Sequence, residues 1–302
     1  MATSALTHHE AKPSVIALHC SLGSGRQWTQ LSETLGRGFE VIAPDLSGYG
    51  KNIARTMLPT TLADEVAQLD DQLDRVKGAV HLVGHSYGGA VAFKMATSAR
   101  WASRIRSLTL IEPVLPTLLR DNAADIRLHD VFADMGTRLS VDLWNGMDME
   151  ALDRFLDFWN GSAPRTGQRS GQSEALNVEA RLRMIEVIEK VPYDFTAILA
   201  EADVAQAAQL LRVPTLLVSG GLSPYMTQRV VTRLAALIPG AEMRHLPAAG
   251  HMSPITHAKM INPEIAGHIE LADDFASVLL AAPPAAAGLA RSNRPQLRLI
   301  PG

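Results

Sequence analysis

The sequence of 302 residues holds a single cysteine and no concentration of charge of either sign. Cys20 has no partner for an internal disulfide, which excludes the disulfide-stapled secreted scaffolds and is typical of a reducing compartment. The 28 basic and 31 acidic residues give a net charge of −3, and no run of lysine or arginine occurs. The sequence therefore lacks an electrostatic footprint for polyanions, and we expect no nucleic-acid partner.

Long hydrophobic runs and targeting signals are missing as well. Residues 278–290 are the most apolar stretch, but Pro283 and Pro284 interrupt it before it reaches the roughly 18 apolar residues of a membrane helix. Residues 1–9 have no basic segment followed by an apolar block, so they do not resemble a secretory signal. We expect a protein without a membrane span that is located in the cytoplasm.

The sequence motifs of common cofactors are incomplete. Gly23 and Gly25 begin a dinucleotide-binding pattern, but the position that requires its third glycine holds Trp28. The pair Gly50-Lys51 lacks the upstream glycine and the following serine or threonine of a phosphate loop. The His-Glu pair near the N-terminus lacks the second histidine of a zinc-binding helix. The sequence therefore implies no metal ion and no cofactor.

Hydrophobic residues make up 47% of the chain and charged residues 20%, so a sizeable core can form. Short apolar segments alternate with amphipathic stretches along the chain. Because these segments are continuously apolar, they predict strands covered on both faces, as in a doubly wound, mostly parallel α/β sheet. The predicted strands are residues 14–20, 40–44, 79–83, 105–111, 213–219 and 242–246.

Helices are predicted between these strands. Residues 61–76 show the pattern best, because Thr61 and Asp64 have the spacing of a capping box and apolar side chains recur on one face. Further helices are predicted over residues 89–99, 225–238 and 257–280.

The alternation stops after Glu112. Residues 113–212 have helical patterns without strands, so we expect a helical cap inserted into an α/β core of residues 1–112 and 213–282. Within the cap, the polar residues 161–173 predict a mobile loop. The alanine- and proline-rich residues 283–302 predict a flexible tail.

One motif carries a specific chemistry. The pattern Gly84-His85-Ser86-Tyr87-Gly88 follows the predicted strand 79–83 and leads into the predicted helix 89–99. This is a nucleophile elbow in its required context, a tight strand-to-helix turn that exposes a serine and needs small flanking residues. Ser86 is therefore the candidate nucleophile.

At this point the sequence resembles the α/β-hydrolase fold family over most of its length apart from the cap and tail. Three further segments are similar to family hallmarks: Leu18-His19-Cys20-Ser21-Leu22-Gly23, Ala43-Pro44-Asp45-Leu46-Ser47-Gly48-Tyr49-Gly50, and Ala249-Gly250-His251-Met252. The resemblance implies that His251 is the general base and that the backbone N–H groups of Ser21 and Tyr87 form the oxyanion hole. Cys20 stands where glycine is usual, which is a departure from the family pattern.

The third member of the triad departs from the commonest family pattern. Most relatives carry an aspartate where this chain has Ser223, and serine cannot carry the charge that orients the histidine. Some family members place their acid after the strand that neighbours the nucleophile's strand, which here makes Glu112 the leading candidate. Asp45 is the weaker alternative.

The resemblance implies a cofactor-independent serine hydrolase that acts on a carboxylic ester or related acyl bond through an acyl-enzyme. Alternatives are a lactone or carbon–carbon bond hydrolase on the same triad, and a noncatalytic ligand-binding homologue, which Ser223 and Cys20 motivate. The expected partner is a small, partly apolar molecule. Six residues are predicted to line its pocket: Trp28, His85, Trp144, Phe158, Trp159 and Met252.

Overall fold

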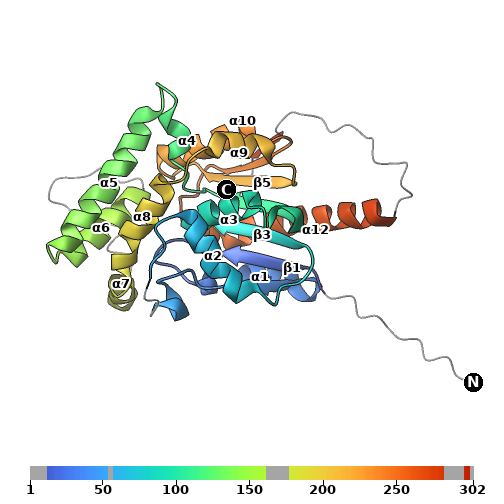
Figure 1. Ribbon diagram of the computed structural model, residues 1–302, viewed down its shortest axis with the longest axis horizontal. Helices are drawn as coiled ribbons and strands as arrows, with labels where there is room; N and C mark the ends of the chain where they lie inside the picture. The colour runs from blue at the N-terminus through green and yellow to red at the C-terminus, as the bar shows by residue number, and fades with distance from the viewer. Residues whose placement is uncertain (1–11, 54–56, 161–176, 282–295, 300–302) are drawn as a thin grey trace, which may run out of the picture.

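The computed structural model describes residues 12–53, 57–160, 177–281 and 296–299 (Figure 1). Seven parallel strands form one sheet in the order β2-β1-β3-β4-β5-β6-β7. The chain thus starts inside the sheet, turns to one edge and then crosses back, which is the doubly wound arrangement that the sequence predicts. The strands are β1 (Ser14–Leu18), β2 (Glu40–Ile42), β3 (Val80–His85), β4 (Ile105–Ile111), β5 (Thr215–Gly220), β6 (Glu242–Leu246) and β7 (Gln296–Leu299).

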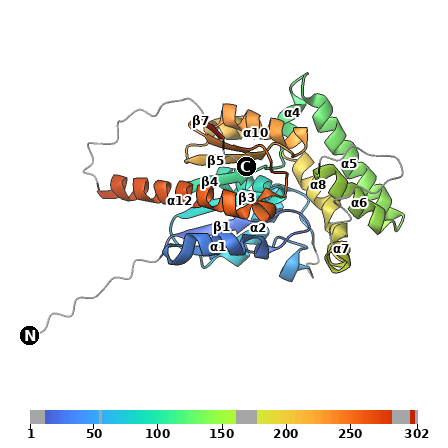
Figure 2. The same ribbon diagram turned by 180° about the vertical axis from the view of Figure 1, so that it is seen from behind.

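Helices cover both faces of this sheet (Figures 1 and 2). Every residue of β1, β3 and β5 is buried, as expected for continuously apolar strands between two helical layers. Two helices pack against one face and three against the other. The first pair is α1 (Thr29–Leu35) and α12 (Ala258–Ala281), and the second group is α2 (Leu62–Leu73), α3 (Tyr87–Thr97) and α10 (Tyr225–Leu237).

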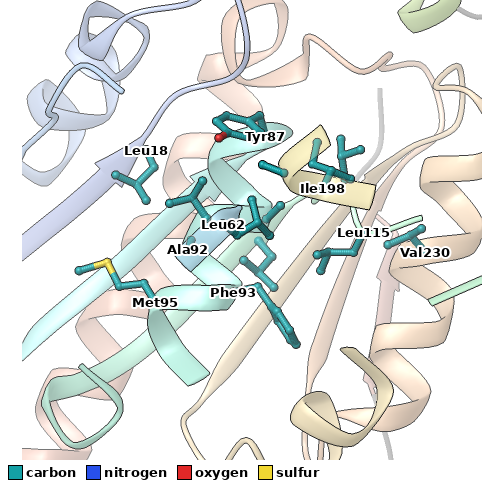
Figure 3. Close-up of a cluster of buried hydrophobic side chains, with 14 of the residues drawn as sticks. Leu18, Leu62, Tyr87, Ala92, Phe93, Met95, Leu115, Ile198 and Val230 are labelled. Atoms are coloured by element: carbon teal, nitrogen blue, oxygen red, sulfur yellow. The ribbon is translucent and has the colours of Figure 1, made fainter. Parts of the chain in front are cut away.

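The larger core cluster joins the sheet to the cap as well as to these helices. Figure 3 shows Phe93 of α3, Leu115 and Ile198 in this cluster, together with Leu18 of β1 and Val230 of α10. All five side chains are buried. The cap therefore shares a hydrophobic core with the sheet layer, which fixes its placement over the strand ends.

Helix α2 begins as the sequence predicts. The Thr61 hydroxyl accepts the backbone N–H of Asp64 at 3.1 Å, and the Asp64 carboxylate accepts the Thr61 N–H at 3.1 Å. The predicted capping box is confirmed, and the predicted helix ends slightly early, at Leu73.

The segment between β4 and β5 contains only helices among its described residues. Four of them gather at the end of the sheet where the strands finish, as Figure 1 shows. They are α5 (Ile126–Trp144), α6 (Asp148–Trp159), α7 (Val178–Ile185) and α8 (Val191–Leu199). The short helices α4 (Thr117–Arg120) and α9 (Val204–Leu210) contact α10 of the core, and α4 also contacts α5. The predicted loop 161–173 lies outside the described residues.

One segment of the predicted tail is described, and it forms a strand that the sequence did not predict. Residues 296–299 form β7, which pairs in parallel with β6 at the edge of the sheet. Within the described ranges, no helix combines the length and the apolar composition needed to cross a membrane.

Candidate active site

The loop between β3 and α3 presents Ser86 at the carboxyl end of the sheet. Ser86 has φ 57° and ψ −121°, a strained conformation for a residue with a side chain. Glycines allow the tight turn, because a Cβ on Gly84 would lie 2.4 Å from the carbonyl oxygen of Gly88. A Cβ on Gly88 would lie 2.3 Å from the carbonyl oxygen of His19. The predicted elbow is thus present in shape, and its glycines are sterically required.

His251 connects Ser86 to Glu112. Its Nε2 atom lies 2.8 Å from Ser86 Oγ, and its Nδ1 atom lies 2.7 Å from Glu112 Oε2. All three side chains are buried. Because the carboxylate can only accept, the Nδ1–H donates to it and Nε2 is left to accept the serine proton. The second carboxylate oxygen, Oε1, accepts the backbone N–H of Gly220 at 2.6 Å, so the glutamate is held on both sides.

Glu112 directly follows β4, the strand next to β3, and has φ 44°. Its positive φ is unusual for a non-glycine residue, and its two hydrogen bonds hold the side chain in a single direction toward His251. Ser223 is buried in the loop after β5, and its hydroxyl has no hydrogen-bond partner among the described residues. The structure therefore brings Glu112, and not Ser223, to the histidine.

Asp45, the alternative acid, has another role. Its carboxylate accepts the backbone N–H of Gly25 at 2.7 Å and that of Lys51 at 2.8 Å. These contacts tie the loop after β2 to the loop after β1, so Asp45 organises the loops beside the site.

His85 holds the backbone of His251 through a hydrogen bond. Its Nε2–H donates to the backbone carbonyl of His251 at 2.8 Å, and its Nδ1 accepts from the Gln27 amide at 3.1 Å. Burial, with the nearby His251, holds the pKa of His85 well below its usual range. A neutral imidazole is the form that this pair of hydrogen bonds requires, so His85 fixes the backbone of His251.

His19 has a comparable role in the loop after β1. Its Nδ1–H donates to the carbonyl of Cys20 at 2.7 Å, and its Nε2 accepts the N–H of Leu46 at 2.9 Å. Burial lowers the pKa of His19. The Cys20 thiol is also buried, which raises its pKa to about 12 and makes it a poor nucleophile. The left-handed conformation in this loop falls on Leu22, with φ 59°, so position 20 does not need the usual glycine.

The two residues predicted to form the oxyanion hole belong to adjacent segments of the chain. Tyr87 begins α3, so its backbone N–H is one of the four that no earlier turn of the helix accepts. The loop that carries Ser21 is adjacent, since the backbone of His19 contacts Gly88 one residue further along α3. The Ser21 hydroxyl donates to Asp194 of α8 at 2.5 Å, a contact that the sequence did not suggest.

The predicted substrate-binding residues fall into different places. The Trp159 indole stacks on the His251 imidazole, with ring centroids 4.3 Å apart and planes inclined by 17°. Phe158 packs edge-on against Trp159, and Met252 is half-buried next to His251 in the sequence. The pocket prediction is wrong for Trp144, which is 90% exposed at the end of α5.

Trp28 also differs from its prediction. It is buried in the second core cluster, against the face of the sheet that α1 and α12 cover. Tryptophan has the bulk to fill this space, so packing in the core accounts for the position of Trp28.

A cavity of about 1030 Å³ adjoins the site between the loops after β1 and β2 and helix α7. Leu22, which follows Ser21, and Gln27, which contacts His85, line this cavity. Lys51 and Met184 line it as well. No group of three or more histidine, cysteine or acidic residues that could hold a metal ion occurs in the part of the chain that the structure describes.

A family model described as the alpha/beta hydrolase family matches residues 15–263. The chain belongs to the alpha/beta hydrolase family. The resemblance seen in the sequence is thereby confirmed, and the match spans the core and the cap together.

Among curated proteins, this alpha/beta hydrolase is similar to lipase LipV of Mycobacterium tuberculosis, with 33% identity over 103 residues. That match covers 33% of the chain, and the chain spans only 37% of the length of the lipase. MenH from S. aureus has a similar structure, with a TM-score of 0.67 at 20% identity over 88% of this chain and 96% of that one. The enol-lactonase from Burkholderia xenovorans LB400 gives a TM-score of 0.65 at 19% identity over 87% and 93%. At these identities the two structures share the fold.

Proposed function

We propose that this alpha/beta hydrolase is a cofactor-independent serine hydrolase that cleaves a carboxylic ester or a related acyl bond. The observation that carries the proposal is the continuous hydrogen-bonded chain Ser86–His251–Glu112 at the carboxyl ends of β3 and β4. Acyl transfer requires a nucleophile, a base within hydrogen-bond reach of it and a third group that orients the base.

In the proposed reaction, Ser86 Oγ attacks the carbonyl carbon of the substrate while His251 Nε2 takes the hydroxyl proton. The carbonyl oxygen becomes an oxyanion, which the N–H groups of Ser21 and Tyr87 hold. Collapse of this intermediate breaks the bond between the carbonyl carbon and the leaving group, and the leaving group takes the proton from His251. The acyl group remains bound to Ser86 as an ester. A water molecule, deprotonated by the same histidine, then hydrolyses this ester and restores Ser86. Glu112 orients His251 and stabilises its protonated form throughout.

The acyl group of the proposed substrate is partly apolar. Trp159 brings aromatic surface directly to His251, and Phe158 packs against Trp159. Such surface favours an apolar substituent close to the reacting carbonyl. The lipase and the enol-lactonase among the similar proteins carry names that fit ester and lactone hydrolysis, and both are acyl-bond reactions.

Covalent labelling tests this proposal. We expect a fluorophosphonate probe to label wild-type Ser86 rapidly, with the site located by peptide mass analysis. Ser86→Ala should abolish labelling and reduce hydrolysis of activated esters to a few per cent or less, while thermal stability stays near wild type because the glycines shape the elbow. Ser223→Ala is the matched control, since it removes another buried hydroxyl that has no hydrogen-bond partner within the described residues. It should change neither the labelling of Ser86 nor the rate of ester hydrolysis.

An inert Ser86 in folded wild-type protein would instead favour a noncatalytic ligand-binding role. Substantial turnover by Ser86→Ala would reject the serine as nucleophile. A probe that labels Ser86 in a protein that hydrolyses no ester or lactone would redirect the search to carbon–carbon bonds, which the same triad can cleave.

A further inference from the structure

The two residues assigned to the oxyanion hole share one buried network through their side chains. The Ser21 hydroxyl donates to Asp194 Oδ2 at 2.5 Å. The Tyr87 hydroxyl donates to Glu65 Oε2 at 2.9 Å. Lys190 Nζ joins the two carboxylates, because it contacts Asp194 Oδ1 and lies 3.5 Å from Glu65 Oε2. A single cation therefore connects the side chains of both oxyanion-hole residues.

The charged side chains of this network are buried so deeply that each charge needs a partner of opposite charge. Lys190 is 3% exposed, Asp194 is 1% exposed and Glu65 is fully buried. Removing one partner of such a pair is costly, since it leaves an uncompensated charge away from water. The remaining acceptor positions are filled as well: Tyr49 donates to Asp194 Oδ2 at 2.5 Å, and the Ser47 N–H donates to Glu65 Oε1 at 2.8 Å.

The chain supplies this network from opposite sides of the site. Lys190 and Asp194 belong to the cap, at the end of the turn 188–190 and on α8, whereas Glu65 lies on α2 of the core. Gly48 has φ 79°, and a Cβ on it would lie 3.0 Å from the Lys190 Cγ. Glycine at position 48 thus leaves room for the lysine stem to cross from cap to core.

We propose that Asp194 is a positioning residue for the oxyanion hole. Through the Ser21 hydroxyl it fixes the loop after β1 so that the Ser21 N–H faces the developing oxyanion, and through Lys190 and Glu65 it braces the start of α3. The oxyanion hole is then complete only when the cap is docked. This inference rests on the proposed serine hydrolase function and assigns it a further residue.

A matched pair of small substitutions tests the role of Asp194. Ser21→Ala and Tyr49→Phe each remove one hydroxyl that donates to the same Oδ2 atom, but only Ser21 belongs to the oxyanion loop. We expect Ser21→Ala to lower kcat by roughly 10-fold with KM within about twofold, because the donor is retained but loosened. Tyr49→Phe should change kcat by less than about twofold. Asp194→Asn, which weakens every contact of the carboxylate, should lower kcat by roughly 100-fold.

Binding of a boronic acid separates positioning from general stability. Its tetrahedral adduct on Ser86 places an oxygen in the oxyanion hole, so its affinity should fall in step with kcat while KM stays nearly constant. Asp125→Asn is the structural control, because it breaks an ion pair between the buried Asp125, just before α5, and the partly exposed Arg229 of α10. It should lower thermal stability and leave kcat and boronate affinity unchanged.

Equal losses in Ser21→Ala and Tyr49→Phe, or a wild-type kcat and boronate affinity in Ser21→Ala, would overturn the inference. A change confined to KM would also overturn it. These small variants decide the matter even if Asp194→Asn fails to fold. Failure of wild-type Ser86 to react with the fluorophosphonate would reject the proposed function and the inference together, whereas a reactive wild type with unchanged Ser21→Ala rejects the inference alone.

Discussion

At the residue scale, the proposed acid, Glu112, is the position where this alpha/beta hydrolase departs furthest from the common pattern of its family. Glu112 lies one strand from the nucleophile's strand instead of two, and adjacent strands are about 4.8 Å apart. The extra methylene of glutamate, together with a positive φ, lets the carboxylate reach His251 from this nearer strand. The Gly220 N–H, which comes from β5, helps to hold it there.

Glu112→Gln should lower turnover by roughly 10² to 10⁴-fold with little loss of folded protein, because it preserves volume and removes the charge that orients the imidazole. Adding Ser223→Asp to this variant should recover part of the activity, since it returns a carboxylate to the usual family position. Steady-state kinetics on an activated ester measures both effects, and Ser223→Ala alone should match wild type. Near-normal turnover by Glu112→Gln would mean that Glu112 is not the acid that serves the histidine.

At the element scale, helix α6 brings the cap into contact with His251, the proposed general base. The stacking of Trp159 on His251 covers one face of the imidazole between its contacts with Ser86 and Glu112. This contact restricts rotation of the ring and keeps water from its surface, so the end of α6 belongs to the site as much as the core loops do.

Trp159→Leu should therefore lower kcat for a short ester by about 10-fold and alter the ranking of esters by acyl size, because a smaller side chain frees space above the histidine. Trp144→Leu makes the same chemical change on an exposed residue of the cap and should leave both unchanged. Turnover and ranking that stay at wild-type values in Trp159→Leu would show that the stacking only contributes to packing.

Some elements of the fold could be predicted from the sequence and others could not, for physical reasons. The buried strands and α2 follow from local patterns, and β4 extends over the predicted residues 105–111. The strand β7 was missed because it is four residues long and pairs only after the chain returns to β6. The contact between Ser21 and Asp194 joins residues 173 positions apart, and neither residue carries a local signal for it. Likewise, an isolated tryptophan such as Trp144 looks the same in sequence whether it faces a pocket or solvent.

At the scale of the whole molecule, the buried side chains of His19, His81 and His85 and the partly buried side chain of His268 make stability depend on pH. Burial lowers the pKa of all four: that of His81 to about 4, that of His85 well below its usual range, and those of His19 and His268 below the usual histidine value. For His81 the nearby Asp273 partly offsets this effect. The folded protein thus keeps these imidazoles neutral where the unfolded chain would protonate them.

Because the unfolded chain takes up protons below about pH 6.5 and the folded protein does so only at lower pH, the free energy of unfolding should decrease as the pH falls from about 6.5. For His81 alone the loss is at most about 3 kcal/mol by pH 4. Urea unfolding at pH 7.5, 6.0 and 5.0 measures how the free energy of unfolding changes with pH. In His81→Gln this free energy should change less with pH than in wild type. A stability that is constant or rises toward pH 5 would contradict the neutral state of these side chains.

The neighbouring positions of Glu112 and Ser223 also bear on how this enzyme family diverges. Both lie at the ends of adjacent strands, and Glu112 already touches the backbone of the strand that leads to Ser223. An ancestor with carboxylates at both places could lose either one and keep a working histidine, so the exchange need not pass through an inactive protein. Under the proposed triad, descent in this family can therefore move the acid between strands by steps that keep the histidine supported, and a serine at position 223 is compatible with the proposed activity.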